Sequence, residues 1–230
     1  MTEINGARVL VTGGQRGLGK AFTRELLDAG ASKVYVTARR PVPEEDPRTI
    51  ALSLEVTDAG SVAALLEAVA DVDIVINNAG SAIPGGLLEG DVADIAGLFD
   101  INVFGPLRIA RAFAPVLAEN GGGALVNVHS VLSWVAGAGA YGATKAALWS
   151  ATNSLRLELS GQGTQVVGVH LGYTDTDMTK GIDAPKNDPR DVAKLVIDAL
   201  LKGESEVLAD EASRHYKSAL SGPVEGLSLV

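Results

Sequence analysis

The chain has 230 residues, of which 47% are hydrophobic, and a formal net charge of −9. This length suits one α/β domain with a full core, and an acidic chain without a dense basic run argues against a nucleic-acid-binding surface. The absence of cysteine excludes disulfides and thiolate chemistry. The chain starts without a signal-peptide pattern, and we expect no run of about 18 apolar residues to span a bilayer. These features predict a soluble, cytoplasmic protein that binds neither nucleic acid nor membrane.

The first predicted strand, Arg8–Thr12, runs into a glycine cluster over residues 13–19, and an amphipathic helix follows. Glycines at such a junction let backbone N–H groups approach a pyrophosphate at the helix N-terminus. The cluster holds Gly13, Gly17 and Gly19, a spacing that differs from the G-x-G-x-x-G fingerprint. We predict a cradle for a dinucleotide phosphate, and a glycine-rich turn without a ligand is the alternative.

The second predicted strand, Lys33–Thr37, is followed by Ala38, Arg39 and Arg40. In a dinucleotide-binding βαβ unit the end of this strand meets the adenosine ribose. An acidic residue there would bind the 2′-hydroxyl, whereas an arginine would accept a 2′-phosphate. Arg39 and Arg40, together with Arg16 from the glycine turn, therefore favour NADP over NAD. The alternative is an ordinary pair of solvated arginines.

The remaining chain alternates strands with helices. Further strands are predicted over residues 49–54, 73–76, 124–128, 165–171 and 206–209, and helices over 61–69, 91–117, 141–159 and 188–203. In the second of these helices, Gly105 and Pro106 are expected to interrupt the helix after Asn102. Such alternation is typical of a parallel, doubly wound sheet. We therefore predict a Rossmann-like α/β fold of about seven strands with helices on both faces, in a single domain over residues 1–230.

Polar residues follow two of the predicted strands. Residues 77–80, Asn-Asn-Ala-Gly, end one strand, and His129 and Ser130 end another. Ligands of open α/β sheets bind at this carboxyl edge. Adjacent strand residues point to opposite faces, so His129 should not activate Ser130, and no G-x-S-x-G elbow surrounds the serine. The three histidines are scattered in the sequence, so no zinc site is expected.

Tyr141 and Lys145 stand four residues apart at the start of a predicted helix. This spacing places both side chains on one face, one turn apart. An ammonium near a phenol favours the phenolate and lowers the tyrosine pKa. Lowering that pKa from about 10 to about 7 requires roughly 4 kcal/mol. The tyrosine could then act as a general acid or base, although such a pair also occurs by chance on many surface helices.

Taken in this order, these motifs resemble the short-chain dehydrogenase/reductases over nearly the whole chain. The resemblance rests on residues 12–19, residues 77–80, Asn102, Ser130, and Tyr141 with Lys145. It implies an NADP(H)-dependent oxidoreductase that acts on a carbonyl or alcohol. Tyr141 would exchange a proton with the substrate oxygen, and Ser130 would bind that oxygen. Lys145 would depress the tyrosine pKa and bind the nicotinamide ribose, and Asn102, in a loosened helix, would hold a water that connects Lys145 to solvent.

The resemblance also implies a set of cofactor contacts. Gly172 and Thr176 stand where the family has a Pro-Gly segment with a downstream threonine near the nicotinamide carboxamide. The full expected set is Gly13, Gln15, Arg16, Gly17, Leu18, Gly19, Arg39, Asn78, Ala79, Gly80, Tyr141, Lys145, Gly172, Thr174 and Thr176. The family further suggests a homodimer or homotetramer through the helices near Asn102 and Tyr141.

The chain departs from the family pattern at three places. Leu171 replaces the usual proline before residue 172, which would loosen the loop that follows. Glu55 stands where the family often has an aspartate near the adenine. Ser130 lies eleven residues before Tyr141, whereas the commoner gap is about two residues longer. Ser133 is therefore a rival, and we favour Ser130 because it directly ends the strand.

Apolar side chains would surround the substrate in this fold, although they could equally be core or interface residues: Ile83, Leu132, Trp134, Tyr173 and Met178. They favour a lipophilic or neutral carbonyl as substrate, with reduction as the working direction. One rival is a non-catalytic NADP(H) sensor on the same fold. The other is a nucleotide-sugar epimerase or dehydratase, a class that shares the Tyr and Lys pair but tends to carry glycine at the Arg16 position and a larger C-terminal domain.

Overall fold

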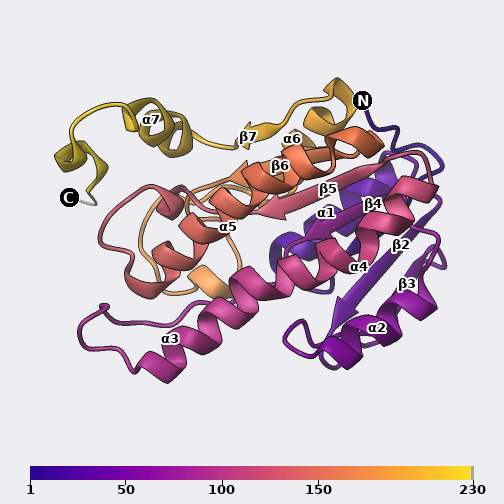
Figure 1. The fold of residues 1–230 in the computed structure, drawn as a ribbon, viewed down its shortest axis with the longest axis horizontal. Helices are drawn as coiled ribbons and strands as arrows, with labels where there is room; N and C mark the ends of the chain where they lie inside the picture. The colour runs from indigo at the N-terminus through magenta and orange to yellow at the C-terminus, as the bar shows by residue number, and fades with distance from the viewer. Residues whose placement is uncertain (229–230) are drawn as a thin grey trace.

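The computed structural model describes residues 1–228. Seven strands form one sheet in the order β3-β2-β1-β4-β5-β6-β7, and each pair of neighbours is parallel (Figure 1). The strands are β1 Arg8–Val11, β2 Lys33–Ala38, β3 Thr49–Ser53, β4 Ile74–Asn77, β5 Ala124–Val128, β6 Gln165–His170 and β7 Glu206–Leu208. The predicted Rossmann-like α/β fold is therefore confirmed.

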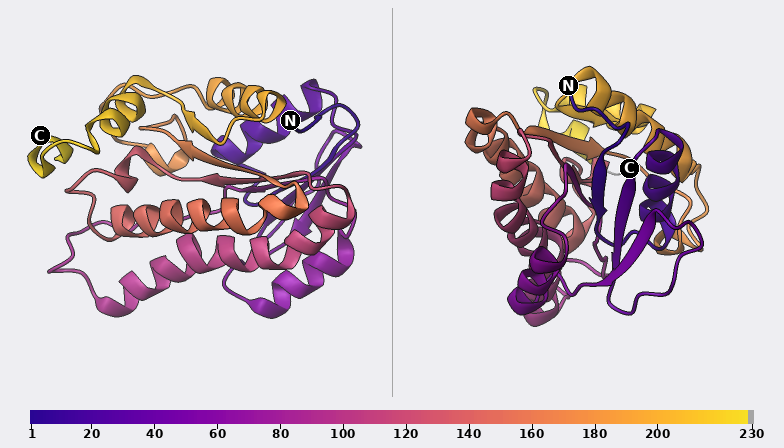
Figure 2. Two further views of the ribbon diagram at one scale, coloured as in Figure 1. Left: turned by 45° about the horizontal axis from the view of Figure 1, so that its top comes forward. Right: turned by 90° about the vertical axis from the view of Figure 1, so that its right-hand side faces the viewer.

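Helices cover both faces of the sheet, as the end-on view of Figure 2 shows. They are α1 Gly17–Asp28, α2 Ala59–Ala68, α3 Val92–Phe99, α4 Gly105–Glu119, α5 Gly139–Glu158, α6 Pro189–Lys202 and α7 Glu211–Ala219. Alternate residues of β1 point to opposite sides. Val9 and Val11 join the core under α1 and α6, and Leu10 joins the core under α2, α4 and α5. This alternation follows from the two-residue period of a strand.

Most predicted elements end within a residue or two of their observed bounds, but α7 was not predicted. Its sequence, Glu211–Ala219, offers no apolar period, because Ser213 is the one residue that it buries. The last predicted helix is confirmed in detail. The Asp188 side chain accepts the N–H of Arg190 at 2.7 Å, and Gly203 ends the helix with φ of 72°.

The expected interruption of the helix near residues 105 and 106 was misplaced. The irregular turn is a π-helical segment, Asp100–Phe104, that joins α3 to α4. Pro106 lies in the first turn of α4 and has no N–H to donate to the preceding turn. The N–H of Gly105 reaches the Asp100 carbonyl, so the chain stays helical through the proline with a wide turn that contains Asn102.

The helical segment Val92–Glu119 is long and apolar enough to cross a membrane, by length and composition alone. The expectation that no such segment exists was therefore wrong. Half of its most apolar window is buried inside the protein. Ile109, Phe113 and Leu117 are buried almost completely against the sheet. A core helix needs an apolar face for this packing, which explains the composition.

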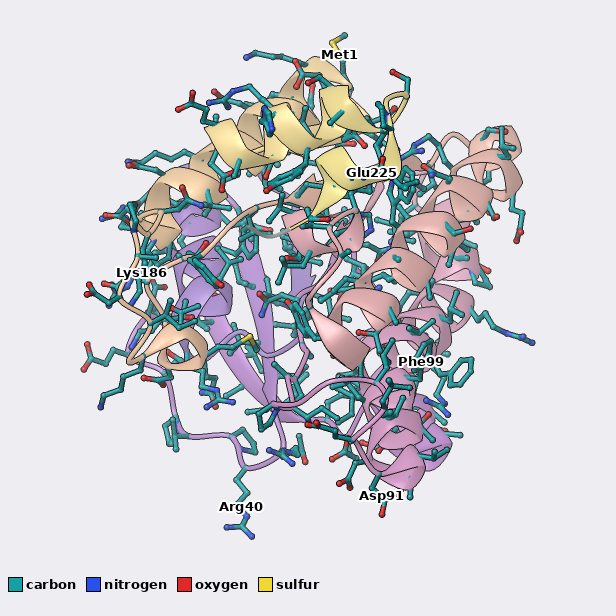
Figure 3. The ribbon with its side chains drawn as sticks, turned by 90° about the vertical axis from the view of Figure 1, so that its left-hand side faces the viewer. Met1, Arg40, Asp91, Phe99, Lys186 and Glu225 are labelled. Atoms are coloured by element: carbon teal, nitrogen blue, oxygen red, sulfur yellow. The ribbon has the colours of Figure 1, made fainter. Side chains whose placement is uncertain are left out.

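The order of the strands reverses between β1 and β4, which defines the point where ligands bind in open α/β sheets. Figure 3 looks onto the sheet from the side to which the carboxyl ends of the strands point. Loops that carry Asp91 and Lys186 lie on either side of this edge, and Arg40 points away from the protein. The residues predicted for the site come from the loops and helices that meet here.

Candidate active site

The glycine turn after β1 is held tightly against the end of β4. The Thr12 hydroxyl accepts the N–H groups of Asn78 and Ala79, both at 3.0 Å. The Asn78 amide donates back to the carbonyl of Thr12 at 2.9 Å. Gly13 has φ of 65°, and a Cβ on Gly19 would lie 2.2 Å from the Gly13 oxygen. Only glycine fits these two positions, so the chain passes close to the start of α1.

This turn fits an anionic dinucleotide. Gly17, with φ of 51°, and the buried Leu18 open α1, whose N-terminus attracts negative charge. Arg16 and Arg39 are exposed, and neither forms an ion pair within residues 1–228. Thr176 lies across the turn, because a Cβ on Gly17 would meet its Cγ2 at 3.2 Å. The start of α1, the arginines that follow β1 and β2, and Thr176 therefore lie at the edge of the sheet where open α/β sheets bind their ligands in a crevice.

Gln15 points elsewhere. Its Nε2 donates to the Val42 carbonyl at 2.6 Å, and its Oε1 accepts the Val42 N–H at 3.0 Å. Nε2 also contacts the Glu44 carboxylate at 2.6 Å. The side chain is therefore engaged with the loop that follows Arg39 and Arg40, and it shapes the rim of the crevice. A direct contact between Gln15 and the cofactor stays a prediction.

Lys145 lies in the second turn of α5 and is 6% exposed. Its Nζ donates to the Val128 carbonyl at 2.9 Å and lies 5.7 Å from the centre of the Tyr141 ring. Burial lowers the lysine pKa to about 8. The Lys145 ammonium is thus held at the end of β5 by one hydrogen bond among the described residues. Its other N–H donors remain available to a ligand.

The expected lowering of the Tyr141 pKa is wrong for the ligand-free chain. Burial raises the pKa of Tyr141 to about 12, and the hydrogen bond with Ser130 acts in the opposite sense but is weaker. Part of the tyrosine surface stays exposed. Lys145 does not offset the burial, because its ammonium is bound to Val128 rather than to the phenol oxygen. The phenol is therefore protonated at neutral pH.

The structure places Ser130, and not Ser133, at Tyr141. The Ser130 hydroxyl accepts the N–H of Leu132 at 3.1 Å, which caps the short helical turn after β5, and it faces the phenol. The Ser133 hydroxyl is buried and has no hydrogen-bond partner among the described residues. The preference for Ser130, which rests on its position at the strand end, agrees with this geometry.

Asn102 is buried in the π-helical turn and bridges two segments of the site. Its amide donates to the Ser81 carbonyl at 2.9 Å and to the Thr144 hydroxyl at 3.0 Å, and its oxygen accepts the Ser81 N–H. A Cβ on Gly80 would lie 3.2 Å from Asn102 Oδ1 and 3.8 Å from Lys145 Nζ. Gly80, Asn102 and Lys145, which come from three separate segments, therefore lie next to one another, as the site prediction requires.

Thr144 was missed by the sequence analysis. Its hydroxyl donates to the Tyr141 carbonyl at 2.8 Å while accepting from Asn102, so it ties the first turn of α5 to the π-helical turn. The side chain is fully buried. The sequence did offer one sign of this role, because Thr144 lies between Tyr141 and Lys145, directly before the lysine.

The loop after β6 meets the prediction only in part. The N–H of Gly172 donates to the Asp210 carboxylate at 2.6 Å and is not directed to the crevice. The Thr174 hydroxyl is buried and donates to the Gly172 carbonyl at 3.3 Å. Thr176 is the residue of this set that reaches the glycine turn. Asp210 was also missed, because it lies 38 residues further along the chain.

Two of the histidines are not scattered in space. His129 Nδ1 lies 3.0 Å from His170 Nε2, and His129 Nε2 lies 2.8 Å from the Thr152 hydroxyl. His170 Nδ1 lies 3.2 Å from the Ser130 carbonyl. Burial is the main reason that the pKa of His170 falls to about 3 and that of His129 falls well below its usual value. The His129 ring forms no hydrogen bond with the Ser130 hydroxyl, as predicted.

Trp134 belongs to this buried region. Its ring stacks on His170 with centres 3.9 Å apart, and it is 7% exposed. It is therefore a core residue, whereas Tyr173 and Met178, on the loop after β6, are exposed by 40% and 53%. Within residues 1–228 no three His, Asp or Glu side chains form a group that could hold a metal ion.

The comparisons with known proteins agree with this geometry. Residues 7–187 match the family model of the short chain dehydrogenases. A ketoacyl reductase, HetN, from Nostoc sp. is 31% identical over 232 residues, which cover 92% of this chain and 81% of that protein. An NADP-dependent 3-hydroxy acid dehydrogenase from Schizosaccharomyces pombe is 28% identical and is matched over 93% of its length by 91% of this chain.

A crystal structure of a short chain dehydrogenase from Burkholderia cenocepacia in complex with NADP is 33% identical. It superposes with a TM-score of 0.92 over 98% of this chain and 97% of that one. The family match, the relatives and the shared fold together define the class. The chain belongs to the short-chain dehydrogenase family of oxidoreductases.

Proposed function

We propose that the chain is an NADPH-dependent carbonyl reductase in which Tyr141 transfers the proton. The observation that carries this proposal is the meeting of Tyr141, Ser130 and Lys145 beside a glycine turn with two unpaired arginines. When bound, NADP(H) supplies the hydride from nicotinamide C4. The chain itself positions the carbonyl and provides the proton.

Tyr141 acts as the acid. With its pKa raised to about 12, the phenol keeps its proton at neutral pH and can donate it to a substrate oxygen that gains charge. Ser130, which already contacts the phenol, holds the same oxygen. Proton transfer by a positioned side chain contributes about 10²–10⁴-fold to a rate. Reduction is proposed as the working direction because NADPH usually serves as a reductant.

Lys145 and Asn102 support that acid. Lys145 has donors left after its bond to Val128, and these can bind a ribose hydroxyl beside Tyr141. Asn102 orders the loop after β4 and, through Thr144, the first turn of α5. Polar groups fixed in this way need little reorganisation during the reaction, which is the main contribution of a preorganised site.

The preference for NADP(H) over NAD(H) rests on Arg16 and Arg39. Both guanidinium groups are exposed beside the crevice, and their planar fork suits a 2′-phosphate. The Schizosaccharomyces pombe relative is named as NADP-dependent, and the Burkholderia cenocepacia structure holds NADP. Replacing Arg39 by alanine should weaken NADPH far more than NADH. Equal losses in two fluorescence titrations would contradict phosphate recognition.

The substrate that we propose is a lipophilic or neutral carbonyl compound. Tyr173, Met178 and Ile182 expose apolar surface on the loop after β6, on the side of the crevice where Thr176 lies. Two of the relatives are named as a ketoacyl reductase and a 3-hydroxy acid dehydrogenase, and both names denote a carbonyl or hydroxyl group as the reacting centre. The apolar loop favours the uncharged part of such a molecule.

We further propose that the chain acts as a single domain over residues 1–230 in the cytoplasm and pairs as a homodimer or homotetramer, without nucleic acid or membrane partners. A hollow of about 930 Å³ lies between α4 and α5, beside the exposed Phe104. An apolar helical surface of this kind suits a second copy of the chain. A monomer in sedimentation experiments would contradict this part of the proposal.

The direct test is a panel of carbonyls and alcohols, monitored by NADPH absorbance. We expect turnover of apolar ketones or ketoacyl compounds with NADPH. Tight NADPH binding without turnover of any compound would favour the alternative, a non-catalytic NADP(H) sensor or regulator on the same fold.

A further inference from the structure

Asp210 joins three separate segments through one carboxylate. Its Oδ2 accepts the N–H of Gly172 and the side-chain amide of Asn187, both at 2.6 Å, and its Oδ1 accepts the N–H of Ser213 at 2.8 Å. Gly172 follows β6, Asn187 precedes α6, and Ser213 lies in the first turn of α7. The carboxylate therefore caps a helix and, at the same time, binds two points of a distant loop.

Those two points form the neck of the loop over residues 172–188. The N–H of Asp175 donates to the Asn187 carbonyl at 3.0 Å, and the N–H of Asn187 donates to the Tyr173 carbonyl at 2.8 Å. Asp210 lies outside the loop and closes the same neck from the side. At the far side of the neck, Thr176 rests on Gly17 of the glycine turn. The position of the neck therefore sets the position of the loop over the crevice.

The carboxylate is built to stay charged. Burial by itself would raise the pKa of Asp210, but the hydrogen bonds from Gly172, Ser213 and Asn187 outweigh it and hold the pKa below its usual value. No lysine or arginine pairs with Asp210 within the described chain. The N-terminus of α7 and the amide donors stabilise the charge instead.

We infer that Asp210 is the positioning residue that closes the 172–188 loop over the crevice and fixes Gly172 beside the site. This inference rests on the proposed function, because the crevice matters only if it holds a dinucleotide and a substrate. Leu171 precedes this loop and lacks the fixed φ of a proline, so the start of the loop depends on its contacts, and the Asp210 carboxylate provides one of them.

The first test is amide hydrogen exchange of the full chain without cofactor, for wild type and Asp210→Asn. Asparagine keeps one acceptor but sets an NH₂ group either against the donors of Gly172 and Asn187 or against the N–H of Ser213, and it removes the charge in both cases. We expect the amides of the loop neck to exchange at least about tenfold faster in the variant, which corresponds to losing one charge-assisted hydrogen bond. The matched control is Asp58→Asn, which removes the N-cap carboxylate of α2 and should leave this loop unchanged.

A second variant separates the loop from the cap of α7. Asn187→Ala removes one contact with Asp210 but leaves its bond to Ser213, so α7 keeps its cap. Exchange at the Gly172 amide should rise in both single variants. The double variant should show less than the sum of the two effects, because the two side chains act as a pair.

With NADPH, we expect Asp210→Asn to raise the KM for the cofactor about tenfold and to lower kcat less, since it alters the closure of the loop rather than proton transfer. Asp210→Glu should restore part of the loss, because it restores the charge. Loop exchange equal to that of wild type in both Asp210→Asn and Asn187→Ala would overturn the inference. A wild-type chain without turnover but with the expected exchange pattern would overturn the proposed function alone.

Discussion

Two buried polar clusters lie at the carboxyl end of β5 and share one residue. One, called the catalytic cluster after the role proposed for it, comprises Asn102, Ser130, Tyr141 and Lys145. The histidine cluster comprises Asn127, His129, Thr152 and His170. The Ser130 hydroxyl belongs to the first cluster, and its carbonyl contacts the second. Both contain side chains whose pKa values are shifted strongly by burial.

The clusters differ in where their hydrogen bonds end. In the histidine cluster, each ring nitrogen has a partner inside the protein, and Asn127 donates to Thr152 at 2.9 Å. In the catalytic cluster, Lys145 has a single acceptor among residues 1–228, and Tyr141 keeps exposed surface. Shifted pKa values alone therefore do not distinguish a site from a core. The distinguishing feature is hydrogen-bonding capacity that is left unsatisfied toward the crevice.

The largest expected effect is that of Tyr141→Phe. Removing the phenol oxygen removes the proton donor, so turnover should fall by at least about 10²–10⁴-fold. NADPH binding, followed by fluorescence titration, should stay close to wild type because the ring remains in place. Substantial turnover in this variant would remove Tyr141 from its assigned role and would erase the contrast between the clusters.

The serine pair gives the next largest effect. Ser130→Ala should lower turnover by about 10²-fold, since one hydrogen bond to the developing oxyanion is lost. Ser133→Ala should change it little, because the Ser133 hydroxyl has no partner in the described chain. Steady-state kinetics on both variants provides the comparison. A larger loss for Ser133→Ala would mean that the wrong serine has been placed in the catalytic cluster.

The pH dependence of kcat/KM should report Lys145. Its pKa of about 8 means that the ligand-free enzyme loses this cation as pH rises through about 8, and kcat/KM should fall over the same range. The free energy of unfolding should instead rise with pH over this range. The pKa of Lys145 in the folded chain lies below its ordinary value of 10.5, so the folded chain binds fewer protons than the unfolded chain. The Lys145 contribution to the free energy of unfolding therefore rises between pH 8 and 10.5. A flat rate profile across this range would contradict the role of Lys145.

The histidine cluster should respond in stability rather than in rate. His170→Phe keeps a ring against Trp134 but leaves the buried His129 Nδ1 without its partner, at a cost of about 1–3 kcal/mol. The Ser130 carbonyl loses the His170 contact but still accepts the N–H of Ser133 at 3.0 Å. Turnover per folded molecule should stay within a few fold of wild type. Urea unfolding measures the first quantity, and kinetics at a temperature where both proteins are folded measures the second.

The free energy of unfolding measured at acid pH provides a control for His170→Phe. Because the folded pKa of His170 is about 3 and its ordinary value is 6.5, the wild type loses stability as pH falls from 6.5 toward 3. The variant lacks this titration and should lose less over the same range. Identical pH dependence in the two proteins would show that His170 is not a buried neutral group.

The positions of the strands along the chain and the residues at their ends were predicted well, because both depend on local patterns. Hydrophobic runs mark the strands, and glycine, asparagine and serine mark the points where they stop. Helix α7 escaped prediction because it has no apolar period. The loosened helix around Asn102 was expected, but the interruption assigned to Gly105 and Pro106 lies a few residues earlier, since a proline is the usual signal of an irregular helix.

The missed features depend on contacts between distant residues. His129 meets His170, and Asp210 meets Gly172, only after the strands pair. The direction of the Tyr141 pKa was wrong for the same reason. The four-residue spacing to Lys145 was visible in the sequence, whereas the burial of the phenol and the bond from Lys145 to Val128 were not.

The most direct test is a paired measurement of kcat/KM for Tyr141→Phe and His170→Phe with NADPH and one accepted carbonyl substrate. Both substitutions lie in the same buried region beside Ser130, so a loss of activity caused only by disturbed core packing should appear in both variants. The account predicts a loss of at least about 10²-fold for Tyr141→Phe and a few fold at most for His170→Phe. Equal losses in the two folded variants would contradict the assignment of Tyr141 as the proton donor.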